Sequence, residues 1–450
     1  MIVAVIDIGK TNAKVALVDL ATLSEIALRR IANAPVRQAP YPHHDVEALW
    51  TFILNSLADL NRERRIDAIS ITTHGATGAL VGAAGELALP VLDYEFDGPD
   101  QLAADYDAVR PPFAETGTPR LPIGLNLGAQ FFWQQKRFPP EFARAAAMLM
   151  YPQYWALRLT GVAANEVTSL GCHTDLWNPW TSDYSSLVDR MGWRRLMAPV
   201  RQAKDRLGPI LPTIAQRTGL APQTPVFCGL HDSNASLLPH LLSDAPPFSV
   251  VSTGTWVVSM AVGGRKVELD AARDTLVNVN ALGDPVPSAR FMGGREFSLL
   301  TEGQPQEWSD DDVAAVLARQ VQLLPSTQQG SGPFPHRAAQ WVNAGGLSPG
   351  QRFAAISFYL ALMSATCLEL IGGDGPTTVE GPFARNPLFI KMLAAATGRS
   401  VVASETSTGT SIGAALLASD GIDTASKGEQ TEPQAEPVWG DYAEAWRLAV

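Results

Sequence analysis

Cysteine and positive charge are both scarce in this chain. The three cysteines of 450 residues, Cys172, Cys228 and Cys367, stand far apart and form no CxxC pair. That spacing argues against a disulfide framework or a zinc cluster, so we expect reduced, buried thiols. The 34 Lys and Arg residues against 45 Asp and Glu give a net charge of −11. A nucleic-acid partner is therefore not expected, whereas a small phosphorylated ligand remains compatible, because helix ends and glycine loops bind phosphate without net positive charge.

The sequence also lacks the segments that direct a chain to or through a membrane. We find no run of about 20 apolar residues, and therefore expect no transmembrane helix and no membrane partner. The five apolar residues that precede Asp7 are too few for a signal peptide, which predicts a cytoplasmic protein. Hydrophobic residues make up 46% and charged residues 18% of the chain, which excludes disorder. At about 150 residues per domain, the length predicts two or three domains.

One local pattern occurs twice. Residues 2–6 predict a buried strand, 7–12 a tight turn and 13–19 a second strand; residues 248–262 repeat this order around Gly254. A polar, proline-containing break at 243–247 separates the two copies. The economical interpretation is two α/β domains of similar size, 1–246 and 247–450, each of which opens with a β-hairpin. The alternative is two unrelated hairpins.

The remaining pattern predicts alternating helices and strands. We expect helices at 46–61 (with Asp45 as its cap), 142–159, around 193–198, 353–370, 388–397 (ended by Gly398) and 442–448, strands at 67–73 and 377–380, and a polar linker at 427–437.

The first hairpin is not a P-loop, although Gly9-Lys10-Thr11 suggests one. The P-loop pattern needs a glycine where Ala4 stands, and it needs a helix where this sequence predicts a strand. A dinucleotide-binding GxGxxG is also missing after every predicted strand.

The same turn can still bind phosphate. Gly9 allows the backbone to approach an oxyanion, and Thr11 and Asn12 offer side-chain donors. Lys10 and Lys14 offer positive charge. The alternative for Lys10 is that it points into solvent.

Two aspartates are candidates for chemistry. Asp7, at the end of the first strand, could hold Mg²⁺ or could cap the turn. Asp232 follows a short strand and begins a predicted helix, where it could serve as an N-cap or as the general base that takes a proton from an attacking hydroxyl. We expect His231 to be structural.

His74, with Asp93, Glu95 and Asp97, is a fair set for binding a polyol, since hydroxyls need directional donors and acceptors. A metal site built from His43, His44, His173 and His231 would lack the usual spacing, because none of these histidines are four residues apart.

Seven motifs in order resemble those of the FGGY carbohydrate kinases, which belong to the actin/hexokinase/Hsp70-like superfold. They are Asp7–Asn12, Thr73–Gly75 with Gly85–Pro90, Trp155–Gly161, Gly229–Asp232, Ser252–Thr255, Gly381–Asn386 and Gly409–Leu416. The resemblance implies two ribonuclease-H-like domains with a cleft between them, and transfer of the γ-phosphoryl group of ATP to a sugar hydroxyl with Mg²⁺. It places Asp232 as the base and Asp7 and Asp232 at the metal. It assigns the nucleotide to Gly9, Lys10, Thr11, Asn12, Lys14, Gly254, Thr255, Gly294, Gly381, Pro382 and Asn386, and the sugar to His74, Gly75, Asp93 and Asp232.

The chain departs from the family pattern at three places. Pro382 replaces the second of two glycines, Lys10 replaces a small or hydroxyl residue, and residues 93–97 replace a Trp-x-Asp stretch. The substrate expected is a ketose such as L-rhamnulose, L-fuculose or xylulose, and the protein could be a homodimer. The alternatives are a non-enzymatic nucleotide-binding or sugar-sensing relative, which would not need an ionised base at Asp232, and more distantly a metal-dependent hydrolase.

Overall fold

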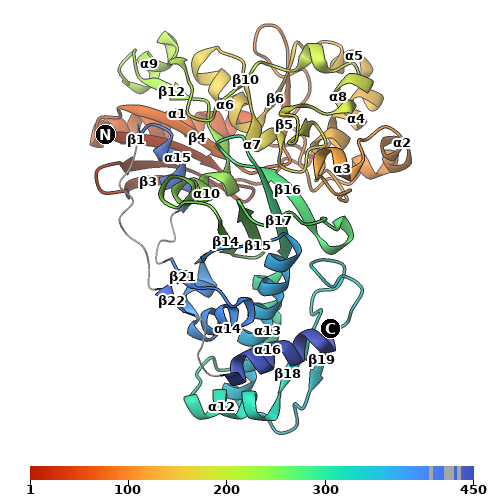
Figure 1. The fold of residues 1–450 in the computed structure, drawn as a ribbon. Helices are drawn as coiled ribbons and strands as arrows, with labels where there is room; N and C mark the ends of the chain where they lie inside the picture. Colours follow the sequence, from red (N-terminus) through yellow and green to blue (C-terminus); the bar gives the residue numbers. More distant parts are fainter. Residues whose placement is uncertain (405–408, 420–429, 433–436) are drawn as a thin grey trace. The chain divides into compact units, whose positions relative to one another are not determined.

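The computed structural model describes residues 1–404, 409–419, 430–432 and 437–450, drawn in Figure 1. They form two compact units. Unit 1 holds Met1–Ser243, Val277–Pro285 and the described residues 409–419; unit 2 holds Asp244–Leu276 and, from Val286 on, the other described residues. The units are thus discontinuous in sequence, unlike a single division at 246/247, which stays a prediction.

Unit 1 is built on a mixed sheet whose strands have the order β11-β12-β4-β1-β2-β3, with β13 also paired to β4. The strands are β1 (Ile2–Ile8), β2 (Asn12–Asp19), β3 (Ser24–Ala32), β4 (Ala68–Thr73), β11 (Arg206–Pro209), β12 (Pro225–Phe227) and β13 (Leu230–His231). β1 pairs antiparallel with β2 and parallel with β4, so the predicted hairpin is confirmed.

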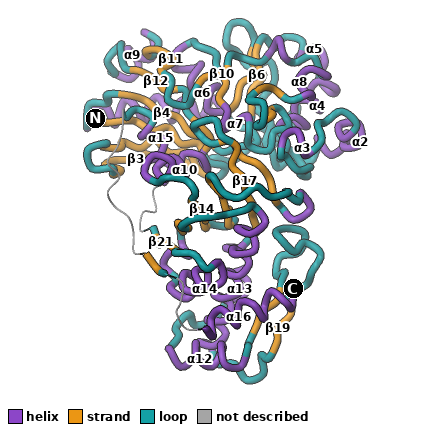
Figure 2. The backbone as a smooth tube through the Cα atoms, viewed as in Figure 1, coloured by secondary structure: helices purple, strands orange, loops and turns teal. Residues whose placement is uncertain are grey.

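Helices pack against this sheet, as the tube in Figure 2 shows. They are α1 (Val46–Glu63), α6 (Tyr151–Thr160), α9 (Pro212–Thr218), α10 (Asp232–Ser243) and α15 (Gly409–Leu416). Alternate residues of β1 enter two different hydrophobic cores: Ile2, Ala4, Ile6 and Ile8 pack with α1 and α6, whereas Val3 and Val5 pack with α10 and α15. This explains why the strand is apolar without alternation, and it places Asp7 on the face of the odd-numbered residues.

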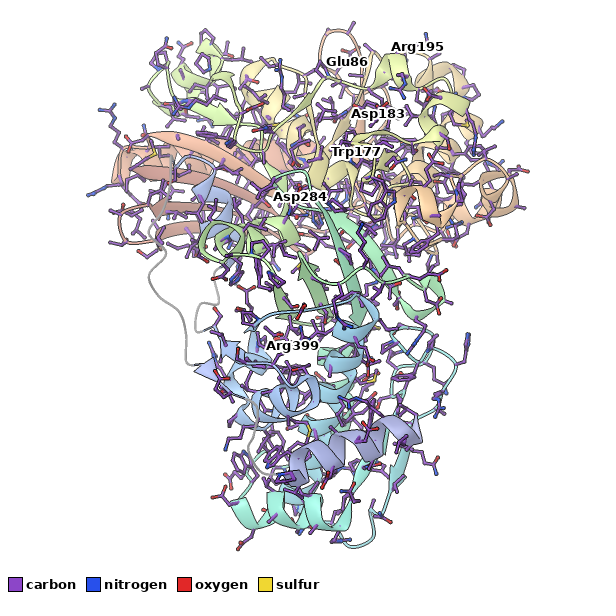
Figure 3. The ribbon with its side chains drawn as sticks, viewed as in Figure 1. Glu86, Trp177, Asp183, Arg195, Asp284 and Arg399 are labelled. Atoms are coloured by element: carbon purple, nitrogen blue, oxygen red, sulfur yellow. The ribbon has the colours of Figure 1, made fainter. Side chains whose placement is uncertain are left out.

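Smaller elements of unit 1 surround a third core. They are β5 (Gly78–Val81), η1 (Gly98–Leu102), α2 (Ala103–Asp107), α3 (Phe113–Thr116), α4 (Leu127–Arg137), α5 (Pro139–Phe142), β6 (Ala147–Met150), β7 (Asn165–Glu166), α7 (Val167–Leu170), β8 (Trp177–Asn178), β9 (Asp183–Tyr184), α8 (Ser186–Arg190), η2 (Arg194–Leu196) and β10 (Val200–Arg201). Trp177 and Asp183, labelled in Figure 3, come from the β8–β9 pair.

Two predicted helices of unit 1 are wrong in extent. The segment 142–159 is not one helix, because β6 pairs with β5 and a new helix, α6, begins at Tyr151 with Pro152 in its first turn. Proline lacks the N–H that a helix interior requires. Near residue 193 there is only the short η2. By contrast, α1 begins after Asp45, whose carboxylate accepts a hydrogen bond from Ala48 N, as predicted.

Unit 2 holds most of a second mixed sheet, with strand order β16-β17-β15-β14-β20-β21-β22. Its strands are β14 (Phe248–Thr253), β15 (Val257–Val262), β16 (Thr275–Val279), β17 (Pro285–Phe291), β20 (Thr377–Glu380), β21 (Val401–Ala403) and β22 (Gln430–Thr431). β14 pairs antiparallel with β15 and parallel with β20, which repeats the arrangement of β1, β2 and β4 and confirms the second hairpin.

The other elements of unit 2 are η3 (Ala271–Arg273), α11 (Gly293–Thr301), α12 (Asp310–Arg319), β18 (Gln322–Leu324), β19 (Gln340–Val342), α13 (Pro349–Leu370), η4 (Pro382–Arg385), α14 (Pro387–Thr397) and α16 (Pro437–Ala449). Gly398, with a φ of 65°, ends α14 as predicted, because the left-handed conformation needed there favours glycine. The linker predicted at 427–437 lies largely outside the described residues.

One helix corrects the expectation about apolar runs. α13 has 22 residues and a mean hydropathy of 1.7, so it is long and apolar enough to cross a membrane by length and composition. However, 78% of the 18-residue apolar stretch within this helix is buried among the other side chains of unit 2, which is typical of a core helix. The cytoplasmic location stays a prediction.

Candidate functional site

Asp7 lies at the end of β1 and is 8% exposed. Burial raises the pKa of its carboxyl to about 6; Lys14, whose Nζ lies 3.5 Å from Asp7 Oδ2, opposes that shift, and Asp232 adds to it. The charge of Asp232 thus acts on the carboxyl of Asp7. Lys14 also pairs with Glu25, at 3.1 Å, so its ammonium is held between two carboxylates.

The turn between β1 and β2 is closed by its own backbone and by a residue that sequence reasoning missed. Gly9 N donates to Asn12 O at 2.9 Å, and a Cβ on Gly9 would lie 3.1 Å from that oxygen. Asn33, which is buried, donates from Nδ2 to Gly9 O at 2.8 Å and from its backbone N to Thr11 O at 2.8 Å. The side chains of Thr11 and Asn12 remain exposed, as a phosphate-binding turn requires.

Asp232 is the first residue of α10, as the sequence predicted. Its Oδ1 accepts hydrogen bonds from Ser233 N at 2.6 Å and lies 3.2 Å from His231 Nε2, while the side chain stays 32% exposed. One carboxylate oxygen is therefore held by the protein, and no described residue is found to hydrogen-bond the other. This is the arrangement that a general base needs, since its second oxygen can face a hydroxyl.

His231 is buried behind Asp232 and also contacts a cysteine. Its Nε2 lies 3.5 Å from Cys172 Sγ, and a Cβ on Gly75 would lie 2.7 Å from the same nitrogen. Burial alone would lower the pKa of His231, but Cys172 and Asp232 raise it to about 9. Gly75, predicted at the sugar, thus has no room for a side chain. All three cysteines are buried and free, as expected.

Lys10 is paired with carboxylates in this structure, and its predicted contact with the phosphates stays a prediction. Its Nζ pairs with Asp93 Oδ1 and lies 3.4 Å from Glu95 Oε2 and 4.6 Å from the centroid of the Tyr94 ring. The alternative that Lys10 points into solvent is wrong, because the side chain is only 15% exposed. A residue predicted at the phosphates and one predicted at the sugar are therefore bonded to each other.

His74 is buried beside other rings. Its centroid lies 5.2 Å from that of His44 and 5.6 Å from that of Tyr94. Burial lowers the pKa of His74 to about 4, so it is neutral at pH 7. Within the described part of the chain, its Nε2 and both ring nitrogens of His44 have no hydrogen-bond partner. Among the described residues, no group of three or more His, Cys, Asp or Glu side chains could hold a metal ion by themselves.

Unit 2 contains a pocket of about 710 Å³ that joins several of the predicted nucleotide residues. It is lined by Thr253, Gly254, Thr255, Gly294, Arg295, Phe297, Ser298, Gln306, Trp308, Phe353, Pro382, Phe383, Arg385, Asn386 and Pro387. Sequence reasoning missed the two arginines and the aromatic residues, because they belong to helices and loops without a local motif. Aromatic walls with a few convergent polar groups suit a nucleobase and its phosphates.

Gly254 and Gly294 line this pocket, and Gly381 directly precedes the lining residue Pro382. A Cβ on Gly294 would lie 2.0 Å from Gly254 O, and a Cβ on Gly381 would lie 2.0 Å from Thr253 O. The second hairpin, the start of α11 and the loop after β20 can therefore approach one another only because these positions are glycine.

Pro382 and Asn386 have local structural roles. Pro382 is the first residue of η4, where the missing N–H would have no helical partner, so the departure from a second glycine is accommodated. Asn386 Oδ1 accepts from Leu388 N and Phe389 N and caps α14, while Nδ2 donates to Ser357 Oγ at 2.9 Å. Its amide is thus committed to the fold, and an adenosine contact stays a prediction.

The residues present fit the two expected ligands. The carboxylates of Asp7 and Asp232 are oxygen donors of the kind that Mg²⁺ prefers, and a bound cation would favour the charged form of Asp7, whose pKa burial and then the charge of Asp232 raise. The glycines and aromatic residues that line the pocket in unit 2 fit a nucleotide.

Comparison with known proteins agrees with this arrangement. Solved structures of a gluconate kinase from Lactobacillus acidophilus (TM-score 0.80, 15% identity, 100% of this chain and 98% of that one) and of Plasmodium falciparum glycerol kinase with ADP (TM-score 0.82, 14% identity, 100% and 97%) share the fold. The two α/β units therefore have the actin-like kinase fold, as the sequence predicted; the cleft stays a prediction.

Family models define the protein more closely. Residues 113–239 match the N-terminal domain of the FGGY family of carbohydrate kinases, and residues 245–427 match the carbohydrate kinase FGGY C-terminal domain. A carbohydrate kinase from Novosphingobium aromaticivorans is 38% identical with a TM-score of 0.92, over 99% of this chain and all of that one. This chain belongs to the FGGY family of carbohydrate kinases.

More distant relatives have named substrates. An L-fuculokinase of Salmonella typhi is 23% identical over 272 residues (59% of this chain), and one of Escherichia coli strain K12 is 26% identical over 289 residues (60% of this chain). The chain spans 57% and 58% of the length of these two relatives.

Proposed function

We propose that this protein transfers the γ-phosphoryl group of ATP to a hydroxyl of a ketose. The observation that carries the proposal is the carboxylate of Asp232 at the start of α10. Ser233 and His231 contact only its Oδ1, the side chain is partly exposed to solvent, and its charge acts on the buried Asp7. A relative that only bound nucleotide would have no use for such a base.

The reaction balances as a simple displacement. The sugar oxygen forms a bond to Pγ, the bond between Pγ and the β,γ-bridging oxygen breaks, and ADP leaves with that bond's electron pair. Asp232, through the oxygen that the protein leaves without a hydrogen bond, takes the proton of the attacking hydroxyl. His231 and Ser233 hold the other oxygen and so fix the direction of the carboxylate.

The remaining site residues act on phosphates and metal. Thr11 and Asn12 of the first hairpin would offer side-chain hydroxyl and amide donors to phosphate oxygens, and Thr255 of the second hairpin would offer a hydroxyl. The N–H groups of Gly9 and Gly254 are already bonded within their own hairpins, to Asn12 O and Trp256 O, so these glycines would allow close approach rather than donate. Asp7, with Asp232, would hold Mg²⁺, which neutralises charge on the phosphates when bound. Arg295 supplies a cation to the pocket of unit 2.

The aromatic half of that pocket would take the base. Phe297, Trp308, Phe353 and Phe383 offer flat apolar surface, which favours a purine over a hydrated ion. The family relation supports ATP as the donor. A homodimer stays a prediction.

The names of the relatives guide the choice of acceptor. The proposal favours L-fuculose and xylulose, with L-rhamnulose as a third ketose. Identities of 23–26% do not fix the sugar, since substrate contacts change within a family while the fold is kept.

The test is an ADP-release assay with Mg·ATP over L-fuculose, L-rhamnulose, L-xylulose, D-xylulose, glycerol and D-gluconate. Sugar-dependent ADP formation, with a phosphosugar product seen by mass spectrometry, supports a kinase. ADP formation without dependence on sugar would indicate a hydrolase instead. Calorimetric binding of Mg·ATP with no turnover on any acceptor would favour the nucleotide-binding alternative.

A further inference from the structure

Two stretches of unit 1 that lie far apart in the sequence, the first hairpin and residues 93–97, contact each other. Lys10 Nζ bonds Asp93 Oδ1, lies 3.4 Å from Glu95 Oε2 and sits over the Tyr94 ring. Because Lys10 and Asp93 are 83 positions apart, only the fold reveals this contact.

The contact is substantially removed from water. The Lys10 side chain is 15% exposed and that of Asp93 is 6% exposed, although that of Glu95 is 58% exposed. Buried ion pairs are weakly screened, and removal of one partner leaves a costly unpaired charge. The ammonium of Lys10 is therefore neutralised by the carboxylate of Asp93.

The same contact belongs to the surroundings of the candidate base. Burial, followed by the charges of Glu95, Asp232 and Asp93, raises the pKa of the Tyr94 hydroxyl. His74 meets the Tyr94 ring edge-on, with centroids 5.6 Å apart, and its charge state responds to both Lys10 and Asp232. Lys10, Asp93, Tyr94, Glu95 and His74, hereafter the Lys10 cluster, are thus one electrostatic neighbourhood with Asp232.

The Lys10 cluster also contains unused hydrogen-bonding capacity. His74 is 6% exposed and its Nε2 has no partner among the described residues; both ring nitrogens of the adjacent His44, 1% exposed, are likewise without one. Buried polar atoms are normally satisfied, so these nitrogens point to a polar ligand or to bound water. Neutral imidazoles can both donate and accept, which matches hydroxyl groups.

We propose that Lys10 is a specificity residue for the sugar and not a ligand of the nucleotide: it positions Asp93 and Tyr94 as one wall of a site for a neutral, polyhydroxylated substrate that rejects acidic sugars. This inference rests on the proposed function. Asp93 accepts hydroxyl hydrogen bonds while Lys10 holds its carboxylate in place.

Charge supports the neutral substrate. Lys10 contributes +1, and Asp93 and Glu95 together contribute −2, so these three residues sum to −1 before Asp232 is counted. A sugar carboxylate would meet net negative charge in partly desolvated surroundings, whereas an uncharged ketose would not. Aldonic acids such as D-gluconate should therefore be poor acceptors.

The experiment compares the parent with Lys10→Met, Lys10→Arg and a matched control, Lys136→Met, which removes an exposed lysine of α4. Steady-state ADP release is measured with the best neutral ketose of the panel and with D-gluconate, and calorimetry with Mg·ADP reports nucleotide affinity. Thermal unfolding checks that each variant is folded, and Lys10→Arg keeps the test open if Lys10→Met is not.

For Lys10→Met we expect the KM for the ketose to rise roughly ten- to hundredfold, the effect of losing one charge-assisted hydrogen bond, with the Kd for Mg·ADP unchanged within twofold. Lys10→Arg should restore part of the sugar KM, and Lys136→Met should match the parent. The parent should use D-gluconate at least a hundredfold less efficiently than the ketose.

Three results would overturn the inference. Lys10→Met could lose tenfold in Mg·ADP affinity with an unchanged KM for the ketose, or it could leave both the ketose KM and the Mg·ADP Kd unchanged. The parent could also use D-gluconate as efficiently as the ketose. Failure of the parent to phosphorylate any acceptor is a different outcome, which refutes the proposed function itself.

Discussion

Replacement of Asp232 by asparagine separates catalysis from folding. Asparagine has the same shape, and its Oδ1 can still accept the hydrogen bond that Asp232 Oδ1 accepts from Ser233 N at 2.6 Å. The variant loses a negative charge at the start of α10, which is worth about 0.3–1 kcal/mol, and it relieves Asp7 of a neighbouring charge, which acts in the opposite direction. We therefore expect the free energy of unfolding to change by less than about 1 kcal/mol.

The effect on catalysis should be much larger. Loss of a positioned base costs about 10²–10⁴ in kcat, which corresponds to about 2.7–5.5 kcal/mol of activation free energy. The assay is single-turnover phosphorylation at saturating Mg·ATP, with thermal unfolding and Mg·ADP calorimetry on the same preparation.

A matched control is Asp310→Asn, which removes the first carboxylate of α12, an exposed helix start in unit 2. It should lose as little stability as Asp232→Asn and no activity. If Asp232→Asn turns over within a few-fold of the parent, the carboxylate only stabilises the helix and the proposed mechanism is refuted.

Two further predictions concern Asp7 and Gly294. In EDTA at pH 8, Asp7→Asn should raise the free energy of unfolding by about 1–3 kcal/mol. The reason is that the pKa of Asp7 is raised from 3.8 to about 6 in the folded protein, so its charged form destabilises the fold above pH 6. The gain should shrink between pH 6 and pH 4 and vanish below pH 4, where Asp7 is protonated in the folded and the unfolded protein. Denaturant unfolding across pH 4–8 measures this, and a gain independent of pH contradicts it. Gly294→Ala should weaken Mg·ADP binding at least tenfold by calorimetry, since its Cβ would lie 2.0 Å from Gly254 O, whereas Gly345→Ala, with open space around it, should have no effect; equal affinities would show that the hairpin does not need this close approach.

Local sequence was sufficient for the elements whose pattern is complete within a few residues. β1 is apolar except for Asp7, and Asp45 and Gly398 are end signals with a local cause, so the first hairpin, α1 and the end of α14 were predictable. The order of short motifs was also sufficient for the family, since motifs at turns and helix starts survive where the rest of the sequence changes.

Local sequence failed where an element depends on a distant partner. Residues 147–150 are as apolar as a helix turn, and only their pairing with β5 makes them a strand. The apolar α13 has the composition of a membrane helix, and only the surrounding side chains of unit 2 show that it is a core helix.

The site divides in the same way. The sequence by itself identified Asp232 as the candidate base and the two glycine turns as candidate phosphate sites, because each of these signals is a strand followed directly by a turn or a helix start. Only the tertiary structure decided that Lys10 bonds Asp93, that Asn33 closes the first turn and that the charge of Asp232 acts on the pKa of the buried Asp7. Charges act through space, and the partners of a charge are set by the packing of strands and loops that lie tens of residues apart in the chain.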